Sequence, residues 1–521
     1  MNIIDLSLFS NRLASVCAEM GAILQRAAFS PNIRDRLDFS CAVFDAKGNL
    51  CAQAAHIPVH LGSMAYAMKG IISRFDWQAD DMVIVNDPYL GGTHLPDVTF
   101  ISPVLKDGIL LAFVANRAHH ADIGAESPGS MPISSCLDEE GLIIPPSYIC
   151  RQGILQDEMM NSLLEATRQP QTMQGDVAAQ MSANRTGCQR VQAMISEVQD
   201  KEGSAAFTSA LNHLNDYGER LARPVYQKIP DGKYCFTDYM DDDGQGNKRI
   251  PISACVTVEG DTIHVDFEGT SRQVAGNINC PLSVAAAAVY YVFRCLLPDY
   301  TPACAGSFRA ITLTAPEASL VNAIRPAAVA AGNVETSTRI VDVIIGALLQ
   351  AIPEQLAAAS HGSMNNVAMG YVGDGDINTG QTAWDYYETI GGGMGASPKS
   401  AGLSGVQTHM TNTLNTPVEV LEINYPLRVK QYALRKGSAG QGQQCGGNGI
   451  IREYEFLHEA SVTLLTERRY QAPWGVNGGK DAAVGINSLN EKVLDAKVSL
   501  DVKKGDSLKI QTPGGGGWGK P

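Results

Sequence analysis

The stretch that decides the fold is residues 82–120, which reads MVIVNDPYLGGTHLPDVTFISPVLKDGILLAFVANRAHH. Apolar and β-branched residues dominate 82–85, 98–105 and 109–114, which predicts three strands. A turn signal, Lys-Asp-Gly at 106–108, separates the last two. The sequence therefore predicts a hairpin of two antiparallel strands, preceded by a polar loop at 86–97.

Three candidate metal ligands, His94, Asp97 and His119, lie at the open end of this hairpin. Residues equally far from the turn return side by side in an antiparallel pair, so we expect the three side chains to meet. Two imidazoles and a carboxylate suit Zn²⁺, Mn²⁺ or Fe²⁺ and leave positions open for water and substrate. Such a metal would lower the pKa of bound water and polarise a carbonyl, as amide hydrolysis requires. The simpler alternative is that each histidine is a hydrogen-bonded loop residue.

Four further residues near the hairpin are candidates for the same site: Asp38, His60, His120 and Asp122. Asp38 opens a strand predicted at 39–44 and is a candidate fourth metal ligand. We assign the other three to general acid–base catalysis or to support of the ligands. His60 lies four residues after His56, and Pro58 between them favours a loop there over a helix. Each of these residues, considered alone, is more often structural.

Helices and strands are predicted in blocks along the rest of the chain. Helical spacing of apolar residues predicts helices over 6–27, 62–75 and much of 155–228. From about residue 230, short alternating runs separated by Asp-Gly and Glu-Gly turns predict antiparallel strands. Helices return near 283–296 and 339–352, and the C-terminal part is strand-like and rich in glycine.

These blocks predict a mixed α and β fold of several lobes, with antiparallel β-sheets and packed helices. A chain of 521 residues is longer than one ordinary domain of roughly 100–200 residues. We expect three regions: an α/β region at 1–228 that holds the candidate metal site, a β-rich region at 229–335, and a glycine-rich α+β region at 336–521.

Composition excludes several classes of protein. The net charge of −14 repels nucleic-acid phosphates, so no nucleic-acid partner is expected. The 12 cysteines form no CxxC pair, and we expect them to be mostly reduced in a cytoplasmic protein. The N-terminus does not look like a signal peptide, and no apolar run approaches the roughly 18 residues of a membrane span.

Phosphate-binding motifs are also lacking. The sequence has no GxxxxGK[ST] loop and no GxGxxG that opens a helix. Glycine runs at 391–395 and 514–517 would let backbone N–H groups approach a phosphate, but such runs are more often tight loops. We therefore predict no cofactor-binding residues beyond the metal ligands.

Many ordered motifs carry a family resemblance. They are Asp38–Asp45, His56–Met64, Asn86–Asp97, Gly332–Ser337, Tyr386–Gly393, Thr411–Thr413, Pro417–Glu419 and Thr512–Gly517. Nearly end to end, the chain resembles the hydantoinase B/oxoprolinase family, which includes N-methylhydantoinase B chains and the large subunits of acetone and acetophenone carboxylases.

The resemblance implies one subunit of an ATP-dependent enzyme. A separate hydantoinase A-type chain, related to acetate and sugar kinases, would bind ATP and Mg²⁺ and phosphorylate the substrate oxygen. The present chain would complete the reaction at a divalent metal, Zn²⁺ or Mn²⁺ ahead of Fe²⁺, held by His94, Asp97, His119 and Asp38. We expect a hetero-oligomer with two or more copies, and a small cyclic amide such as 5-oxoproline or an N-alkylhydantoin as substrate.

Two other functions stay open. The same architecture would serve ATP-dependent carboxylation of a ketone, with bicarbonate consumed in place of water. A non-enzymatic scaffold that only positions the A-type chain would bind no metal and would tolerate His94→Ala.

Overall fold

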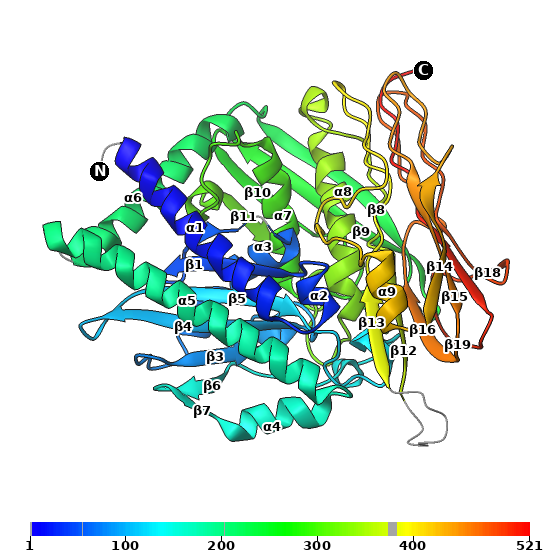
Figure 1. Ribbon diagram of the computed structural model, residues 1–521. Coiled ribbons are helices and arrows are strands. Elements are labelled where there is room, and N and C mark those ends of the chain that lie inside the picture. The colour runs from blue at the N-terminus through cyan, green and yellow to red at the C-terminus, as the bar shows by residue number, and fades with distance from the viewer. Residues whose placement is uncertain (1–2, 55, 203, 373–382) are drawn as a thin grey trace.

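The computed structural model describes residues 3–54, 56–202, 204–372 and 383–521, and in them four β-sheets are surrounded by packed helices (Figure 1). The predicted mixed α and β fold is confirmed. Almost all strand pairs are antiparallel, as predicted, while β10 (Thr262–Asp266) and β11 (Ile311–Thr314) pair in parallel.

The first sheet holds the predicted hairpin at its centre. Its strands run in the order β2-β1-β5-β4-β3-β6-β7. Their bounds are β1 Phe39–Asp45, β2 Leu50–Gln53, β3 Met82–Val85, β4 Asp97–Lys106, β5 Ile109–His119, β6 Ser147–Arg151 and β7 Ile154–Leu155. β4 and β5 pair with Asp97 directly opposite His119, which confirms the hairpin and its turn.

Helices cover both faces of this sheet. On one face lie α1 (Ile3–Ala27), α5 (Pro170–Glu202) and α6 (Ser204–Tyr226), and α3 (Pro58–Ile72) lies on the other. Alternate residues of β1 divide between the two cores, Val43 toward α1 and Phe44 toward α3, because successive strand side chains point to opposite faces. Figure 1 shows α1 and α5 side by side across the front of the sheet. The short helices α2 (Pro31–Arg34) and α4 (Asp157–Ala166) complete this part.

The second sheet has the order β11-β10-β9-β8, with β8 at Gly232–Asp242 and β9 at Lys248–Glu259. Its apolar face packs on α7 (Leu282–Leu296) and α8 (Ser337–Leu348) in one core. A π-helical turn, Gly332–Thr336, leads directly into α8.

The third and fourth sheets share an apolar core and therefore pack face to face. The third has the order β13-β12-β16-β19 and the fourth β14-β15-β20-β17-β18. Their bounds are β12 Asn366–Tyr371, β13 Trp384–Glu388, β14 Leu427–Arg435, β15 Gly449–Phe456, β16 Ala460–Leu465, β17 Ile486–Leu489, β18 Lys492–Leu494, β19 Lys497–Val502 and β20 Ser507–Gln511, with α9 at Val418–Asn424. Figure 1 shows β14 and β15 on the side of the molecule away from α6.

Each sheet lies within one of the three predicted regions. The first sheet falls in 1–228, the second in 229–335, and the other two in 336–521. The boundaries between the regions stay a prediction.

Two cysteines differ from the expected free thiols. Cys235 of β8 and Cys255 of β9 lie opposite each other and form a disulfide, while ten cysteines are free. This pair follows from strand register, which no local cysteine motif reveals. Within the described ranges, no helix has both the length and the apolar character needed to cross a membrane.

Candidate metal centre

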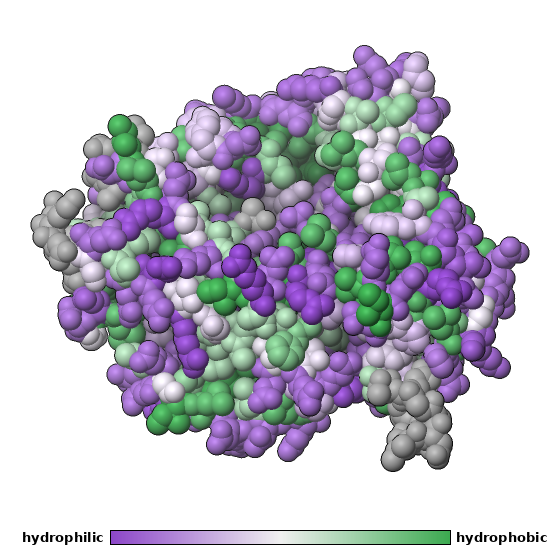
Figure 2. Space-filling view, in the orientation of Figure 1, coloured by the Kyte–Doolittle hydropathy of each residue, from purple (hydrophilic) through white to green (hydrophobic). Residues whose placement is uncertain are grey.

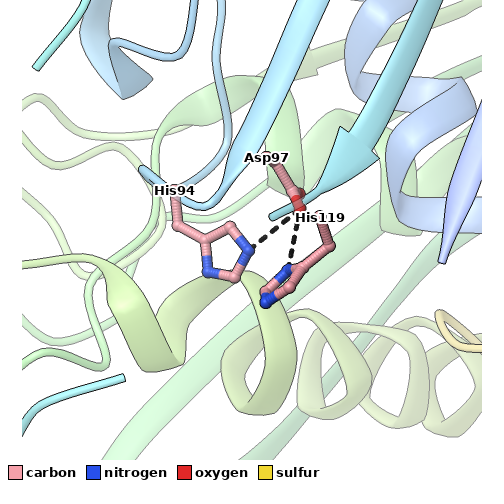
Figure 3. A group of neighbouring side chains, drawn as sticks. All are labelled: His94, Asp97 and His119. Atoms are coloured by element: carbon pink, nitrogen blue, oxygen red, sulfur yellow. Dashed lines mark hydrogen bonds and ion pairs between the residues drawn. The ribbon is translucent and has the colours of Figure 1, made fainter. Parts of the chain in front are cut away.

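The hairpin brings His94, Asp97 and His119 together, as the sequence predicts (Figure 3). His94 lies in the loop before β4, Asp97 begins β4 and His119 ends β5. One nitrogen or oxygen from each lies within 4.8 Å of the others. Asp97 Oδ1 is 3.2 Å from His94 Nε2 and 3.1 Å from His119 Nδ1. All three side chains are buried.

The loop that presents His94 is held by close backbone packing. Asn86 donates from its amide to the carbonyl of Leu95 at 2.8 Å and so spans the loop. A Cβ at Gly92 would lie only 1.9 Å from the carbonyl oxygen of Asn86, which no side chain can tolerate. Glycine at this position therefore allows the tight return that places His94 over the start of β4.

A hydrogen bond on the side of the His94 ring away from Asp97 determines which ring nitrogen carries the proton. Its Nδ1 lies 3.0 Å from the carbonyl oxygen of Ala330, and because a carbonyl only accepts, Nδ1 must donate. In a neutral ring Nε2 then points a lone pair at Asp97 Oδ1. Two facing lone pairs need a proton or a metal ion between them. Nε2 of His94 and Nε2 of His119 are both buried without a hydrogen-bond partner, so this donor set fits a divalent metal.

The second oxygen of Asp97 is fully engaged. Its Oδ2 accepts from the hydroxyl of Thr93 at 2.7 Å and from the amide of Asn333 at 3.1 Å. His60 Nε2 lies 3.1 Å from the same oxygen. Asn333 sits on the π-helical turn, a local structure that often marks functional sites. These contacts orient the carboxylate so that Oδ1 faces His94 and His119.

Charges within the group shift several pKa values. Burial would raise the pKa of the Asp97 carboxyl, but His60 and His94 hold it well below its ordinary range. Burial lowers the pKa of His94, but the neighbouring Asp97 carboxylate outweighs this effect and the pKa is raised. Burial lowers the pKa of His119. A charged Asp97 carboxylate and a neutral His119 ring are the forms that bind a metal, whereas at His94 a metal has to compete with a proton.

A small cavity lies beside these residues. Asp38, His60, Asp97 and His119 line it, and its volume of about 20 Å³ gives room for one ion or one water. The ring of Tyr387 also lines it and stacks on His119, with ring centres 4.7 Å apart. The space is too small for a five-membered ring.

His60 and Asp38 both face this cavity. The predicted loop around Pro58 is wrong, because Pro58 is the first residue of α3 and suits that position through its missing N–H. His60 therefore projects from the first turn of the helix. Asp38 Oδ1 lies 3.9 Å from His60 Nε2, outside the group of three. Its role as a fourth ligand stays a prediction.

His120 and Asp122 lie away from the cavity. His120 follows His119 on the chain and points to the other face, where its Nε2 is 2.8 Å from Gln180 Oε1. Asp122 accepts from the hydroxyl of Ser130 at 2.9 Å and from the backbone N–H of Arg168 at 2.8 Å. These contacts brace the surrounding loops, and the catalytic role of both residues stays a prediction.

Sequence reasoning gave no role to several residues of the site. Asn333 and Tyr387 fall within family-like motifs, which was the only signal for them. Glu140 carried no such signal. Its Oε1 accepts from the backbone N–H groups of Val329 at 2.8 Å and Ala330 at 2.9 Å, so it holds the carbonyl that faces His94. Burial raises the pKa of Glu140 to about 7.

The glycine run at 514–517 packs among neighbouring loops. A Cβ at Gly515 would lie 2.0 Å from the carbonyl oxygen of Met394. This close backbone contact explains the glycines without a bound phosphate.

Comparison with known proteins gives matches along the whole chain. The family model described as hydantoinase B/oxoprolinase matches residues 2–521. An uncharacterized protein of Methanocaldococcus jannaschii is 39% identical, and the match covers 100% of this chain and 91% of the relative. 5-Oxoprolinase 1 of Arabidopsis thaliana is 36% identical over 99% of this chain, which spans only 42% of that relative. The putative B-type subunit of a D-/L-hydantoinase from Pseudomonas sp. strain NS671 is 34% identical, over 98% of this chain and 88% of the relative.

Two solved structures share the fold. The ATP-dependent caprolactamase from Pseudomonas jessenii superposes with a TM-score of 0.90 at 26% identity, covering 100% of this chain and 92% of the other. Acetone carboxylase in a nucleotide-free state superposes with a TM-score of 0.86 at 17% identity, covering 99% and 76%.

Proposed function

We propose a function for this chain from one premise: it belongs to the hydantoinase B/oxoprolinase family. It acts as the metal-dependent B-type subunit of an ATP-dependent amidohydrolase that opens a lactam or hydantoin ring. The observation that carries this proposal is the buried group of His94, Asp97 and His119 beside a cavity for one ion or water. The names of two relatives, a 5-oxoprolinase and a B-type hydantoinase chain, support the same substrate class.

His94, Asp97 and His119 would hold the metal, with Asp38 as a candidate fourth ligand on the cavity wall. Nitrogen and carboxylate donors in this number suit Zn²⁺ or Mn²⁺. When bound, a divalent ion lowers the pKa of a water and polarises a substrate carbonyl.

The residues of the chain prepare this chemistry. The Ala330 carbonyl keeps a proton on His94 Nδ1 and leaves Nε2 free as a ligand. Thr93 and Asn333 fix the Asp97 carboxylate, and Tyr387 covers one face of the His119 ring. The surrounding protein keeps bulk water out, because every one of these ligands is buried.

His60 is suited to carry a proton during ring opening. Its Nε2 lies 3.1 Å from Asp97 Oδ2 and 3.9 Å from Asp38 Oδ1, on the wall of the metal cavity. In hydrolysis the water oxygen bonds to the carbonyl carbon and the C–N bond breaks with its electron pair on nitrogen. The water loses one proton and the nitrogen gains one, and we assign that transfer to His60.

ATP and Mg²⁺ are held by a partner A-type chain in this proposal, since the present sequence has no phosphate-binding loop motif. Phosphorylation of the amide oxygen turns a resonance-stabilised carbonyl into a reactive carbon. Water addition and C–N cleavage then leave the phosphoryl group on the new carboxyl oxygen, and a second water releases it as inorganic phosphate. The two chains work as a hetero-oligomer with two or more copies.

The test is an assay of this chain co-purified with an A-type partner, with 5-oxoproline and N-methylhydantoin as substrates. We expect ADP and ring-opened product to form together, and neither product to form with His94→Ala. The exposed His213→Ala serves as the matched control. Ring opening at full rate without ATP would contradict the proposal. Incorporation of carbon from labelled bicarbonate into a ketone substrate would show that the complex is a carboxylase and not a hydrolase.

A further inference from the structure

A groove of about 500 Å³ borders the metal cavity, and Thr411 lines both. It is formed by α7, the end of α8, the start of α3 and the loops at 355–360 and 394–412. Figure 2 shows a hollow with hydrophobic walls on this face, in the region where α7 and α8 lie in Figure 1. Its volume falls in the range of about 300–1,000 Å³ that is typical of sites for small molecules.

The chemistry of the walls favours an uncharged ligand. Leu296, Ile345 and Leu356 supply apolar surface, and the amides of Gln407 and Asn412 supply hydrogen-bonding groups. Among the described residues, none of those that line the groove is an Asp, Glu, Lys or Arg. A carboxylate moved from water into such a groove would lose hydration and would meet no Lys or Arg side chain among the lining residues.

One histidine in the groove lies against a buried carboxylate. His409 lines the groove, and its Nε2 lies 3.4 Å from Oδ1 of Asp342, which is fully buried. Arg468 donates to the other oxygen of Asp342 at 2.5 Å. Burial would raise the pKa of Asp342, but His409 and Arg468 lower it to about 2, so the carboxylate stays charged.

Thr411 joins the groove to the metal cavity, because it lines both. Its hydroxyl is buried without a hydrogen-bond partner. Beside it the Val59 N–H donates to the Met410 carbonyl at 3.4 Å and ties the start of α3 to this loop. A ring held in the groove would therefore present its amide edge to the metal cavity at Thr411, while the rest of the ring stays in the groove.

We propose that this groove binds the substrate of the ring-opening reaction, and that the substrate is a small uncharged cyclic amide whose polar edge contacts His409 and Thr411. The proposal rests on the function proposed above and narrows its substrate class to rings without a carboxylate. Arg294 lines an adjoining groove of about 320 Å³ instead, where a carboxylate would find a partner.

The experiment compares 2-pyrrolidinone with 5-oxoproline, which is the same ring carrying a carboxylate. Both are assayed as substrates of the full chain in complex with its A-type partner, in the presence of ATP. We expect a lower KM for 2-pyrrolidinone, and a KM raised roughly tenfold by His409→Gln, as the loss of one good hydrogen bond predicts. Metal content should not change in this variant.

Two controls keep the result interpretable. The exposed His213→Gln on α6 should leave the KM unchanged. Should His409→Gln fail to fold, Ala357→Phe narrows the groove from a loop and should raise the same KM with metal retained. A lower KM for 5-oxoproline, or a wild-type KM in both groove variants, would overturn the groove as the substrate site while leaving ATP-dependent ring opening intact. Failure of the complex to open any ring with ATP would instead overturn the proposed function.

Discussion

Replacing Asp97 with asparagine tests the metal centre through stability. The change keeps the shape of the side chain, and the amide oxygen, placed where Oδ2 now lies, can still accept from Thr93 and Asn333. It removes the charge that His94 and His119 face at 3.2 and 3.1 Å. The substitution should therefore weaken metal binding far more than it disturbs the packing of the side chain.

The magnitude follows from linkage between binding and folding. At a free metal concentration of 100 times Kd, a bound ion stabilises the folded chain by about 2.7 kcal/mol. Loss of a residue that only supports a ligand costs about 10–100-fold in affinity, so loss of the Asp97 charge should cost at least about 100-fold. At the same metal concentration the stabilisation of Asp97→Asn then falls to about 0.4 kcal/mol.

The assay is urea unfolding of both chains, each with chelator and with Mn²⁺ or Zn²⁺. Asp122→Asn is the matched control, since Asp122 is a buried carboxylate with several donors that lies outside the cavity. It should lower stability overall and keep the full metal-dependent gain. An undiminished gain in Asp97→Asn, or an equal loss in both variants, would refute the reasoning.

Three further perturbations test the support of the site. Gly92→Ala should lower the unfolding free energy by about 1–3 kcal/mol and weaken metal binding, because the new Cβ would meet the Asn86 carbonyl. Gly70→Ala in α3 is the control for urea unfolding, since it has open space and should not destabilise the chain. Burial raises the folded pKa of Glu140 to about 7, against an ordinary 4.5, so its stabilising contribution is complete below about pH 4.5 and is lost as the pH rises through 7. Glu140→Gln should therefore remove a fall in unfolding free energy of roughly 3 kcal/mol between pH 5 and 8, and an unchanged pH profile would count against this. Chelation of the isolated chain before it meets its partner should abolish ring opening, and added Mn²⁺ or Zn²⁺ should restore it.

The three central residues of the site could be predicted from the sequence because a hairpin is formed by neighbouring segments of the chain. Counting from the 106–108 turn predicts that the two strand ends meet, and Asp97 indeed pairs with His119. The same counting does not separate His119 from His120, although strand alternation sends them to opposite faces. Pro58 is expected to break a helix, yet proline is favoured in the first turn, where it begins α3.

Contacts between distant segments lay beyond sequence reasoning. Asn333 reaches Asp97 across 236 positions of the chain. Tyr387 stacks on His119 from a strand of another sheet, and Glu140 acts through the backbone of Ala330. Such contacts depend on how the sheets pack, which periodicity and turn signals do not specify. The Cys235–Cys255 pair is likewise set by the register of β8 and β9.

Metal analysis of the purified chain tests the central claim most directly. After equilibration with Mn²⁺ or Zn²⁺ and removal of the free ion, the wild-type chain should retain a stoichiometric divalent ion, and chains with His94→Ala or His119→Ala should retain almost none. Equal metal in the wild-type chain and both variants, or none in the wild-type chain, would contradict the assignment of His94, Asp97 and His119 as the metal centre.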